Sequence, residues 1–284
     1  MPPLPGTGRV SVAVPAPGTG LGCWAGAPSA AFGADGEIVL AYRLRDAERR
    51  GCEVVVGDVT LGKERFGAES LERPALVRAG GGWRLYLSCA TPGSKHWWIC
   101  ALDAPSLAAL ADAEPVTVFA GDAATGVKDP VIRRDGSGWR AWLCCHPLEE
   151  PGEEDRMTTA YATSHDGLAW EWHGTVLAGR PGAWDARGAR VTAVLPDGTV
   201  YYDGRSRKAD NFREQTGMAR GEDGFAVEGA RLVGGAGPVA DVRYLDVLPL
   251  PGGGWRLFYE APLPDGSHEL RTELIDSAAW PSRA

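Results

Sequence analysis

The sequence lacks the segments that mark nucleic-acid-binding, membrane-spanning or secreted proteins. Its 284 residues include 37 Asp and Glu against 29 Lys and Arg, and no stretch is rich in Lys and Arg. Nucleic acids and anionic membranes require clustered positive charge, so we expect neither as a partner. No apolar run approaches the roughly 18–20 residues of a membrane span. Residues 1–8 show neither the basic nor the apolar region of a secretory signal.

Metal, cofactor and disulfide motifs are also missing. The six cysteines include no CxxC pair, and Cys144 and Cys145 are adjacent, which is a poor geometry for a mutual disulfide. We therefore expect buried thiols in a cytoplasmic protein. The five histidines are dispersed without metal-ligand spacing, and neither a nucleotide-phosphate loop nor a nucleophilic Ser motif is seen. We expect no metal and no cofactor.

Glycine, proline and tryptophan are plentiful instead. The 39 Gly and 21 Pro are scattered along the chain, which suits many short strands joined by turns. The 11 Trp exceed what a core needs, so some are expected on a surface that meets a ligand.

A hairpin pattern recurs five times, as an apolar strand, a Gly-containing turn and a second strand. The copies occupy residues 27–43, 73–89, 129–145, 190–205 and 244–261. Their second strands begin at Glu37, Trp83, Trp139, Thr199 and Trp255, which are 46, 56, 60 and 56 residues apart. This spacing leaves room for two further strands in each unit. The pattern predicts an all-β protein, a single five-bladed β-propeller over residues 1–284 with mostly four-stranded antiparallel blades. One helical pattern, residues 106–113, is expected between the second and third blades.

The propeller prediction also places the candidate site. Loops that enter the first strand and leave the second strand of every blade open on one face, so residues distant in sequence converge there. The candidate ligand-binding residues at these positions are Trp24, Arg43, Arg73, His146, Arg190, Arg205, Glu214, Arg243, Tyr244 and Asp246. The carboxyl groups of Asp129, Asp203 and Glu260 fall at the same positions. Carboxylates accept hydroxyl hydrogen bonds, Arg clamps oxygens and Trp packs on sugar rings, so we expect a small sugar-like or anionic ligand.

Three segments resemble the five-bladed propeller glycosidases, namely the arabinanase/β-xylosidase, invertase/levansucrase and β-mannoside phosphorylase families. They are APSAAFGADGEIVLAYRLR (27–45), VKDPVI (127–132) and ATSHDGLAWEW (162–172). The resemblance extends over nearly the whole chain as a blade pattern. It implies a glycoside hydrolase-like, carbohydrate-active enzyme in which Asp129 orients substrate hydroxyls and stabilises the transition state.

The sequence departs from these families at the beginning of the first strand in two of the predicted blades. Gly26-Ala27-Pro28 stands where the hydrolases carry an Asp, and residues 186–194 lack their acidic Glu. A glycosidase needs two carboxyl groups, about 5–5.5 Å or 6.5–9.5 Å apart. The second would come from Asp203, Glu214, Asp246 or Glu260, so Asp129, Glu260 and Asp203 are the candidate catalytic residues.

Alternatives to hydrolysis stay open at this point. In a phosphorylase, Arg73, Arg190, Arg205 and Arg243 would hold phosphate, while His146 or His96 would act as an acid or bind substrate. The chain could also be a non-catalytic propeller that binds a sugar or another small anion, or a biosynthetic enzyme that reuses the same site. In each case we expect a monomer.

Asp129 is the residue for which the sequence makes the sharpest predictions. Arg73, Asp129, Arg190, Tyr244 and Glu260 should line one pocket. Pro130 should bias Asp129 towards an extended conformation. A catalytic Asp129 predicts that Asp129→Asn abolishes activity and leaves the fold intact, whereas a structural Asp129 predicts a lower melting temperature.

Overall fold

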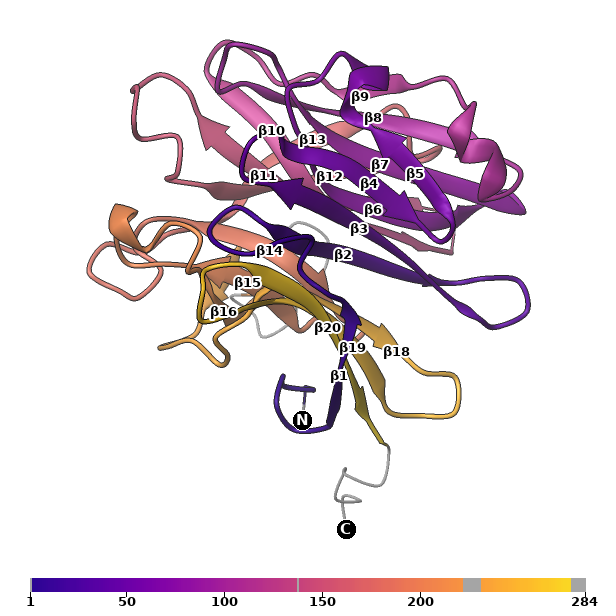
Figure 1. Cartoon of the computed structure of the whole chain (residues 1–284). Helices are drawn as coiled ribbons and strands as arrows, with labels where there is room; N and C mark the ends of the chain where they lie inside the picture. Colours follow the sequence, from indigo (N-terminus) through magenta and orange to yellow (C-terminus); the bar gives the residue numbers. More distant parts are fainter. Residues whose placement is uncertain (1, 137, 222–230, 277–284) are drawn as a thin grey trace.

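The computed structural model describes residues 2–136, 138–221 and 231–276, and twenty β-strands within them build the fold (Figure 1). Three separate sheets have four antiparallel strands each. The first comprises β6 (Leu71–Ala79), β7 (Gly82–Ala90), β8 (Trp97–Ala104) and β9 (Val116–Phe119). The second comprises β10 (Thr125–Asp135), β11 (Gly138–Pro147), β12 (Thr158–Ser164) and β13 (Glu171–Ala178). The third comprises β14 (Ala189–Val194), β15 (Val200–Gly204), β16 (Gln215–Gly221) and β17 (Leu232–Gly234).

The remaining eight strands form one sheet that joins the two ends of the chain. It contains β18 (Arg243–Pro249), β19 (Trp255–Pro262), β20 (His268–Ile275), β1 (Arg9–Val14), β2 (Trp24–Phe32), β3 (Ile38–Asp46), β4 (Arg50–Val56) and β5 (Val59–Gly62). β1 pairs with β20 in antiparallel fashion, and Figure 1 shows these strands side by side. β2 meets β20 at a single parallel pair, Trp24 with His268. The predicted all-β propeller architecture is confirmed. The number of blades stays a prediction, because it depends on dividing this sheet at the Trp24–His268 pair.

The five hairpins predicted from the turns are all present, as β2–β3, β6–β7, β10–β11, β14–β15 and β18–β19. The helical pattern at 106–113 was misplaced. It gives only the short 3₁₀ segment η2 (Ala108–Ala111), which lies between β8 and β9 of one sheet. Two more 3₁₀ segments are η1 (Lys63–Phe66) and η3 (Lys208–Asp210), and the described residues contain no α-helix.

The first strand of each hairpin is interrupted by a β-bulge close to the beginning of the strand. The register shifts fall in 26–29, 72–74, 128–131, 191–193 and 243–246. Within the bulges Ala27, Asp129 and Tyr244 have positive φ angles of 52°, 49° and 52°. The expectation that Pro130 holds Asp129 extended was therefore wrong. The bulge overrides the local preference, because an extra residue on one strand must turn aside to let the pairing resume.

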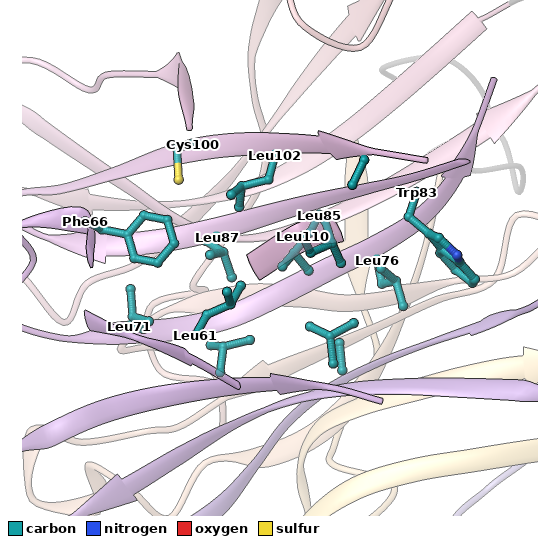
Figure 2. Close-up of a cluster of buried hydrophobic side chains, with 14 of the residues drawn as sticks. Leu61, Phe66, Leu71, Leu76, Trp83, Leu85, Leu87, Cys100, Leu102 and Leu110 are labelled. Carbon is teal, nitrogen blue, oxygen red and sulfur yellow. The ribbon is translucent and has the colours of Figure 1, made fainter. Parts of the chain in front are cut away.

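Aliphatic side chains fill the spaces between sheets. Figure 2 shows one such cluster, in which Leu71, Leu76, Leu85 and Leu87 of β6 and β7 face Leu61 of β5. Leucines 61, 71, 85 and 87 are almost fully buried. Burial of such side chains stabilises a fold by about 1.5–3 kcal/mol each, so this packing fixes the sheets that carry the site.

The cysteine expectation is confirmed in part. All six cysteines lie within the described residues and are free thiols, and only Cys23 is not buried. In the part of the chain that the structure describes, no helix has the length and apolar character to cross a membrane. The cytoplasmic location stays a prediction.

Candidate functional site

A cavity of about 820 Å³ lies where the first hairpin strands begin and the second ones end. Of the residues singled out from the sequence, it is lined by Trp24, Arg43, His146, Arg190, Arg205, Arg243 and Tyr244. Nine basic residues line it in total: Arg43, Arg45, Arg50, Lys95, Lys128, Arg190, Arg205, Lys208 and Arg243. Only Glu72, Glu154 and Asp155 are acidic. We call this space the basic cavity.

The candidate carboxylates do not face the basic cavity. Asp129, Asp203 and Glu260 are fully buried, and Glu214 is nearly so. None of them lines the wall, and neither do Arg73 or Asp246. The expectation that Arg73, Asp129 and Glu260 share one pocket lining with Arg190 and Tyr244 was wrong. These buried acids accept hydrogen bonds from basic side chains that line the basic cavity. The lining therefore offers mainly N–H donors to a ligand, and few carboxylate acceptors.

Asp129 lies beneath the floor of the basic cavity. Its Oδ2 accepts hydrogen bonds from Arg190 Nη1 at 3.0 Å and Tyr244 Oη at 3.2 Å. Lys128 Nζ lies 3.4 Å from the same oxygen. Arg190 also donates from Nη2 to Asp203 Oδ2 at 2.6 Å. One guanidinium group therefore bridges two of the three candidate catalytic carboxylates.

Arg190 lies in the segment where the resemblance implies a catalytic Glu. Burial by itself lowers the pKa of Arg190, but Tyr244, Asp203 and Asp129 together raise it well above its usual value. Arg190 is thus a permanent cation, and its ion pairs hold Asp129 and Asp203 in place.

Glu260 is the centre of a second buried group. It accepts hydrogen bonds from Arg43 Nη2 at 2.9 Å, Arg243 Nη1 at 2.7 Å and His268 Nδ1 at 2.6 Å. Burial favours the neutral acid, but Arg243 and Arg43 lower the pKa of Glu260 far below its usual value. A Cβ at Gly26 would lie 2.0 Å from Glu260 Oε2. Glu260 occupies the space that a side chain at position 26 would need. Only glycine therefore fits at this position near the start of β2.

Arg73 and Asp246 form a further pair that does not line the basic cavity. Arg73 Nη2 donates to the Thr192 carbonyl at 2.6 Å and lies 3.9 Å from Asp246 Oδ1. Asp246 in turn accepts a hydrogen bond from the Ala30 amide at 2.7 Å. Arg73 thus connects β6 to β14, which belong to sheets that do not follow each other along the chain, and Asp246 connects β18 to β2.

The aromatic residues of the wall are partly covered. The Trp24 ring stacks on His268 at 4.8 Å, and Phe212 lies 4.8 Å away at a tilt of 54°. Trp24 is only 2% exposed, so it offers little face to a sugar. The Trp97 ring lies 4.2 Å from Lys128 Nζ.

His146 is a neutral wall residue. Burial, followed by Lys128, Arg190 and Arg205, lowers its pKa well below the usual value. Its Nε2 is buried without a hydrogen-bond partner among the described residues. Neutral imidazole can accept from or donate to a ligand, but it supplies no ready proton. Across the ranges that the structure describes, no cluster of three His, Cys, Asp or Glu has the arrangement of a metal site.

The loop at 148–157 forms one side of the basic cavity, and its role was not predicted from the sequence. Arg187 donates to Glu153 and Asp155, with Nη1 and Nη2 each 2.7 Å from a carboxylate oxygen. Arg205 Nη2 donates to Asp155 Oδ2 at 2.9 Å, and Lys208 donates to the Gly152 carbonyl. The signal in the sequence is the acidic run at 153–155 together with the basic run at 205–208.

Acid should weaken the ion pairs that hold the loop at 148–157. Hydrogen bonds from Arg187 and Arg156 hold the pKa of Glu153 at about 2, below its ordinary 4.5. A depressed folded-state pKa stabilises the fold fully above the unfolded value, and this contribution is lost as the pH falls towards the folded value. We expect the difference in melting temperature between wild type and Glu153→Gln to shrink as the pH falls from about 5 to about 2. A melting-temperature difference that stays constant over this pH range would contradict the stabilising role of the Glu153 ion pairs.

Comparisons with known proteins agree with this architecture. No protein-family profile matches the chain, and no curated protein sequence matches it. Among solved structures, a thermostable family-43 glycoside hydrolase is similar at a TM-score of 0.64 and 15% identity, over 93% of this chain and 91% of that one. A structure from the family-130 mannoside phosphorylases, a family that includes hydrolases of β-1,2-mannosidic linkages in Candida mannan, gives 0.63 and 14%, over 100% and 98%. An endo-arabinase from Bacteroides thetaiotaomicron gives 0.62 and 14%, over 94% and 97%.

The predicted resemblance is thereby confirmed at the level of the fold: the chain has the fold of the propeller glycosidases at low sequence identity. At this identity the likeness extends to the fold, and the chemistry has to be argued from the side chains.

Proposed function

We propose that the basic cavity binds a small, sugar-like ligand through hydrogen bonds donated by the protein. The observation that carries this proposal is the composition of its wall, where nine Lys and Arg face three Asp and Glu in a chain of net charge −8. Sugar hydroxyls and oxyanions are good acceptors for guanidinium and ammonium groups. A volume of about 820 Å³ suits a ligand of one or a few sugar rings.

Hydrolysis by a pair of carboxyl groups is not the chemistry that this site favours. Asp129 and Asp203 both bind Arg190, and Glu260 is held by Arg43, Arg243 and His268. A general acid or base must reach the scissile bond or its attacking water. These carboxylates lie behind the wall instead, which supports a structural role for them.

Phosphorolysis is a second candidate, and Lys128 and Arg190 favour it. Both line the basic cavity beside Asp129, where inorganic phosphate could replace water as the nucleophile. The glycosidic C–O bond would break, hydrogen phosphate would form the new bond to the anomeric carbon, and the leaving oxygen would take up the proton that hydrogen phosphate gives up.

Calorimetric titration of oligosaccharides, with and without phosphate, tests both candidates, with activity assays on the same samples. We expect sugar binding in either buffer and no hydrolysis. Release of a sugar phosphate only when phosphate is present would establish the second candidate. Hydrolysis without phosphate would contradict a structural role for the buried carboxylates.

Asp129→Asn connects these assays to the buried ion pairs. We expect a lower melting temperature, because Asn removes the charge that pairs with Arg190 and Lys128. Sugar affinity should fall no more than the loss of folded protein explains. An unchanged melting temperature with turnover abolished would instead make Asp129 catalytic.

A further inference from the structure

Six arginines line the basic cavity, and five of them are paired with carboxylates. These are Arg43 with Glu72 and Glu260, Arg50 with Glu69, Arg190 with Asp129 and Asp203, Arg205 with Asp155 and Glu214, and Arg243 with Glu214 and Glu260. The sixth is Arg45. It forms no ion pair with any carboxylate in residues 2–136, 138–221 and 231–276.

Arg45 is nevertheless held in a defined position. Its Cζ lies 4.7 Å from the centre of the Trp24 ring, a distance typical of a stacked guanidinium group. Trp24 is itself fixed, because its Nε1 donates to the Gly266 carbonyl at 3.1 Å and its ring stacks on His268. The Nε of Arg45 is buried with no acceptor among the described residues. A positioned donor without an acceptor is typical of a ligand-binding group.

Glu72 is the acid with the largest electrostatic influence on Arg45, but its ion pair is with Arg43. Glu72 accepts a hydrogen bond from Arg43 Nε at 3.0 Å, and Arg43 and Lys128 together hold the pKa of Glu72 at about 2 although burial opposes this. Burial is the main influence on the pKa of Arg45 and lowers it. The negative charge of Glu72 opposes burial, whereas the positive charges of Arg43 and Arg50 add to it. The charge of Glu72 therefore reaches Arg45 only from a distance, and no carboxylate among the described residues forms an ion pair with Arg45.

Arg43 shows what a structural arginine looks like at this place. Its side chain is 1% exposed and binds two carboxylates, and it lies on the same strand and face as Arg45, two residues earlier. Arg45 has the same chemistry without the partners. If its role were structural, the fold would carry a largely buried cation there that no described carboxylate contacts.

We infer that Arg45, stacked on Trp24, is the anchor for an oxyanion on the ligand, so the ligand is an acidic sugar that bears a carboxylate or a phosphate group. This inference rests on the proposed function and specifies its ligand class. The oxyanion supplies the acceptor that Arg45 Nε lacks. The remaining basic residues of the wall donate to the sugar hydroxyls.

The test compares Arg45→Met with Arg78→Met. Arg78 also stacks on a tryptophan, with Cζ 4.8 Å from the Trp83 ring, but it lies outside the basic cavity. Calorimetry would use four probes: glucuronate, glucose 6-phosphate, inorganic phosphate and glucose. We expect the two acidic sugars to bind wild type more tightly than glucose does. Arg45→Met should weaken them at least about tenfold, which corresponds to one charge-assisted hydrogen bond. Arg78→Met should bind all four probes like wild type.

Melting temperature separates a ligand role from a structural role. Arg45→Met should melt at or above the wild-type temperature, because it removes a cation that lacks a carboxylate partner. A large drop would make Arg45 structural and overturn the inference.

The probes also separate this inference from the proposed function. Sugar binding with no preference for anions, or anion binding that survives Arg45→Met, overturns the inference and leaves the proposed function standing. Arg45-dependent binding of inorganic phosphate without any sugar overturns the proposed function and leaves an anion site. Wild type that binds none of the four probes contradicts both.

Discussion

Arg190→Met is expected to lower the free energy of unfolding by about 3–5 kcal/mol, the usual cost of removing one partner from a buried ion pair. The cost is high because Arg190 serves two acids. Its Nη1 and Nη2 lie 3.0 Å from Asp129 Oδ2 and 2.6 Å from Asp203 Oδ2, and both carboxylates are fully buried. Methionine fills similar space but leaves two buried charges with reduced compensation.

Urea unfolding of Arg190→Met measures this cost. Arg220→Met is the matched control, since Arg220 is exposed at the end of β16, and its change should stay within about 0.5 kcal/mol. Adding Asp203→Asn to Arg190→Met should recover part of the loss, because it removes one uncompensated charge. Stability close to wild type for Arg190→Met would refute the buried bridge.

Glu260→Gln should cost about 3 kcal/mol of unfolding free energy. Glutamine keeps the shape but cannot neutralise Arg43 and Arg243, which both donate to the Glu260 carboxylate. Because the pKa of Glu260 is strongly depressed, this stabilisation is complete above the ordinary carboxyl pKa and is lost as the pH falls below it. The gap between wild type and Glu260→Gln should therefore narrow in acid.

Glu269→Gln is the control for this comparison. Glu269 also pairs with an arginine, Arg271 at 2.7 Å, but that arginine is 36% exposed. Solvent-exposed pairs contribute about 0–1 kcal/mol, so Glu269→Gln should melt nearly like wild type. If Glu260→Gln kept full stability and lost only ligand binding or turnover, Glu260 would belong to the site chemistry.

The hairpins were predictable because their information is local. A Gly-containing turn and alternating apolar residues fix both strands and their register within about 20 residues. The hairpin predicted over residues 73–89, for example, forms β6 and β7. The helical pattern at 106–113 failed because a run of alanine and leucine supports one short 3₁₀ turn but spans a connection within a sheet.

The candidate site was predictable as a set of residues but not as an arrangement. The convergence of strand ends predicted that Arg43, Arg190 and Tyr244 lie together, and all three line one cavity. The direction of each side chain depends on the β-bulges, which place Asp129 at a φ of 49° beneath the floor. The sequence pattern at VKDPVI does not reveal that bulge, because Pro130 by itself favours an extended neighbour.

The sequence by itself determined the all-β architecture, the hairpins and the face on which charged residues gather. The tertiary structure decided which charges neutralise each other and which remain for a ligand. Arg43 and Glu260 are 217 positions apart, and Arg190 and Asp129 are 61 apart. Such pairs depend on the relative placement of whole sheets, and a change of a few ångströms in low-dielectric surroundings converts an ion pair into an uncompensated charge. That is why Arg43 and Arg45, two residues apart on one strand, have different partners and different roles.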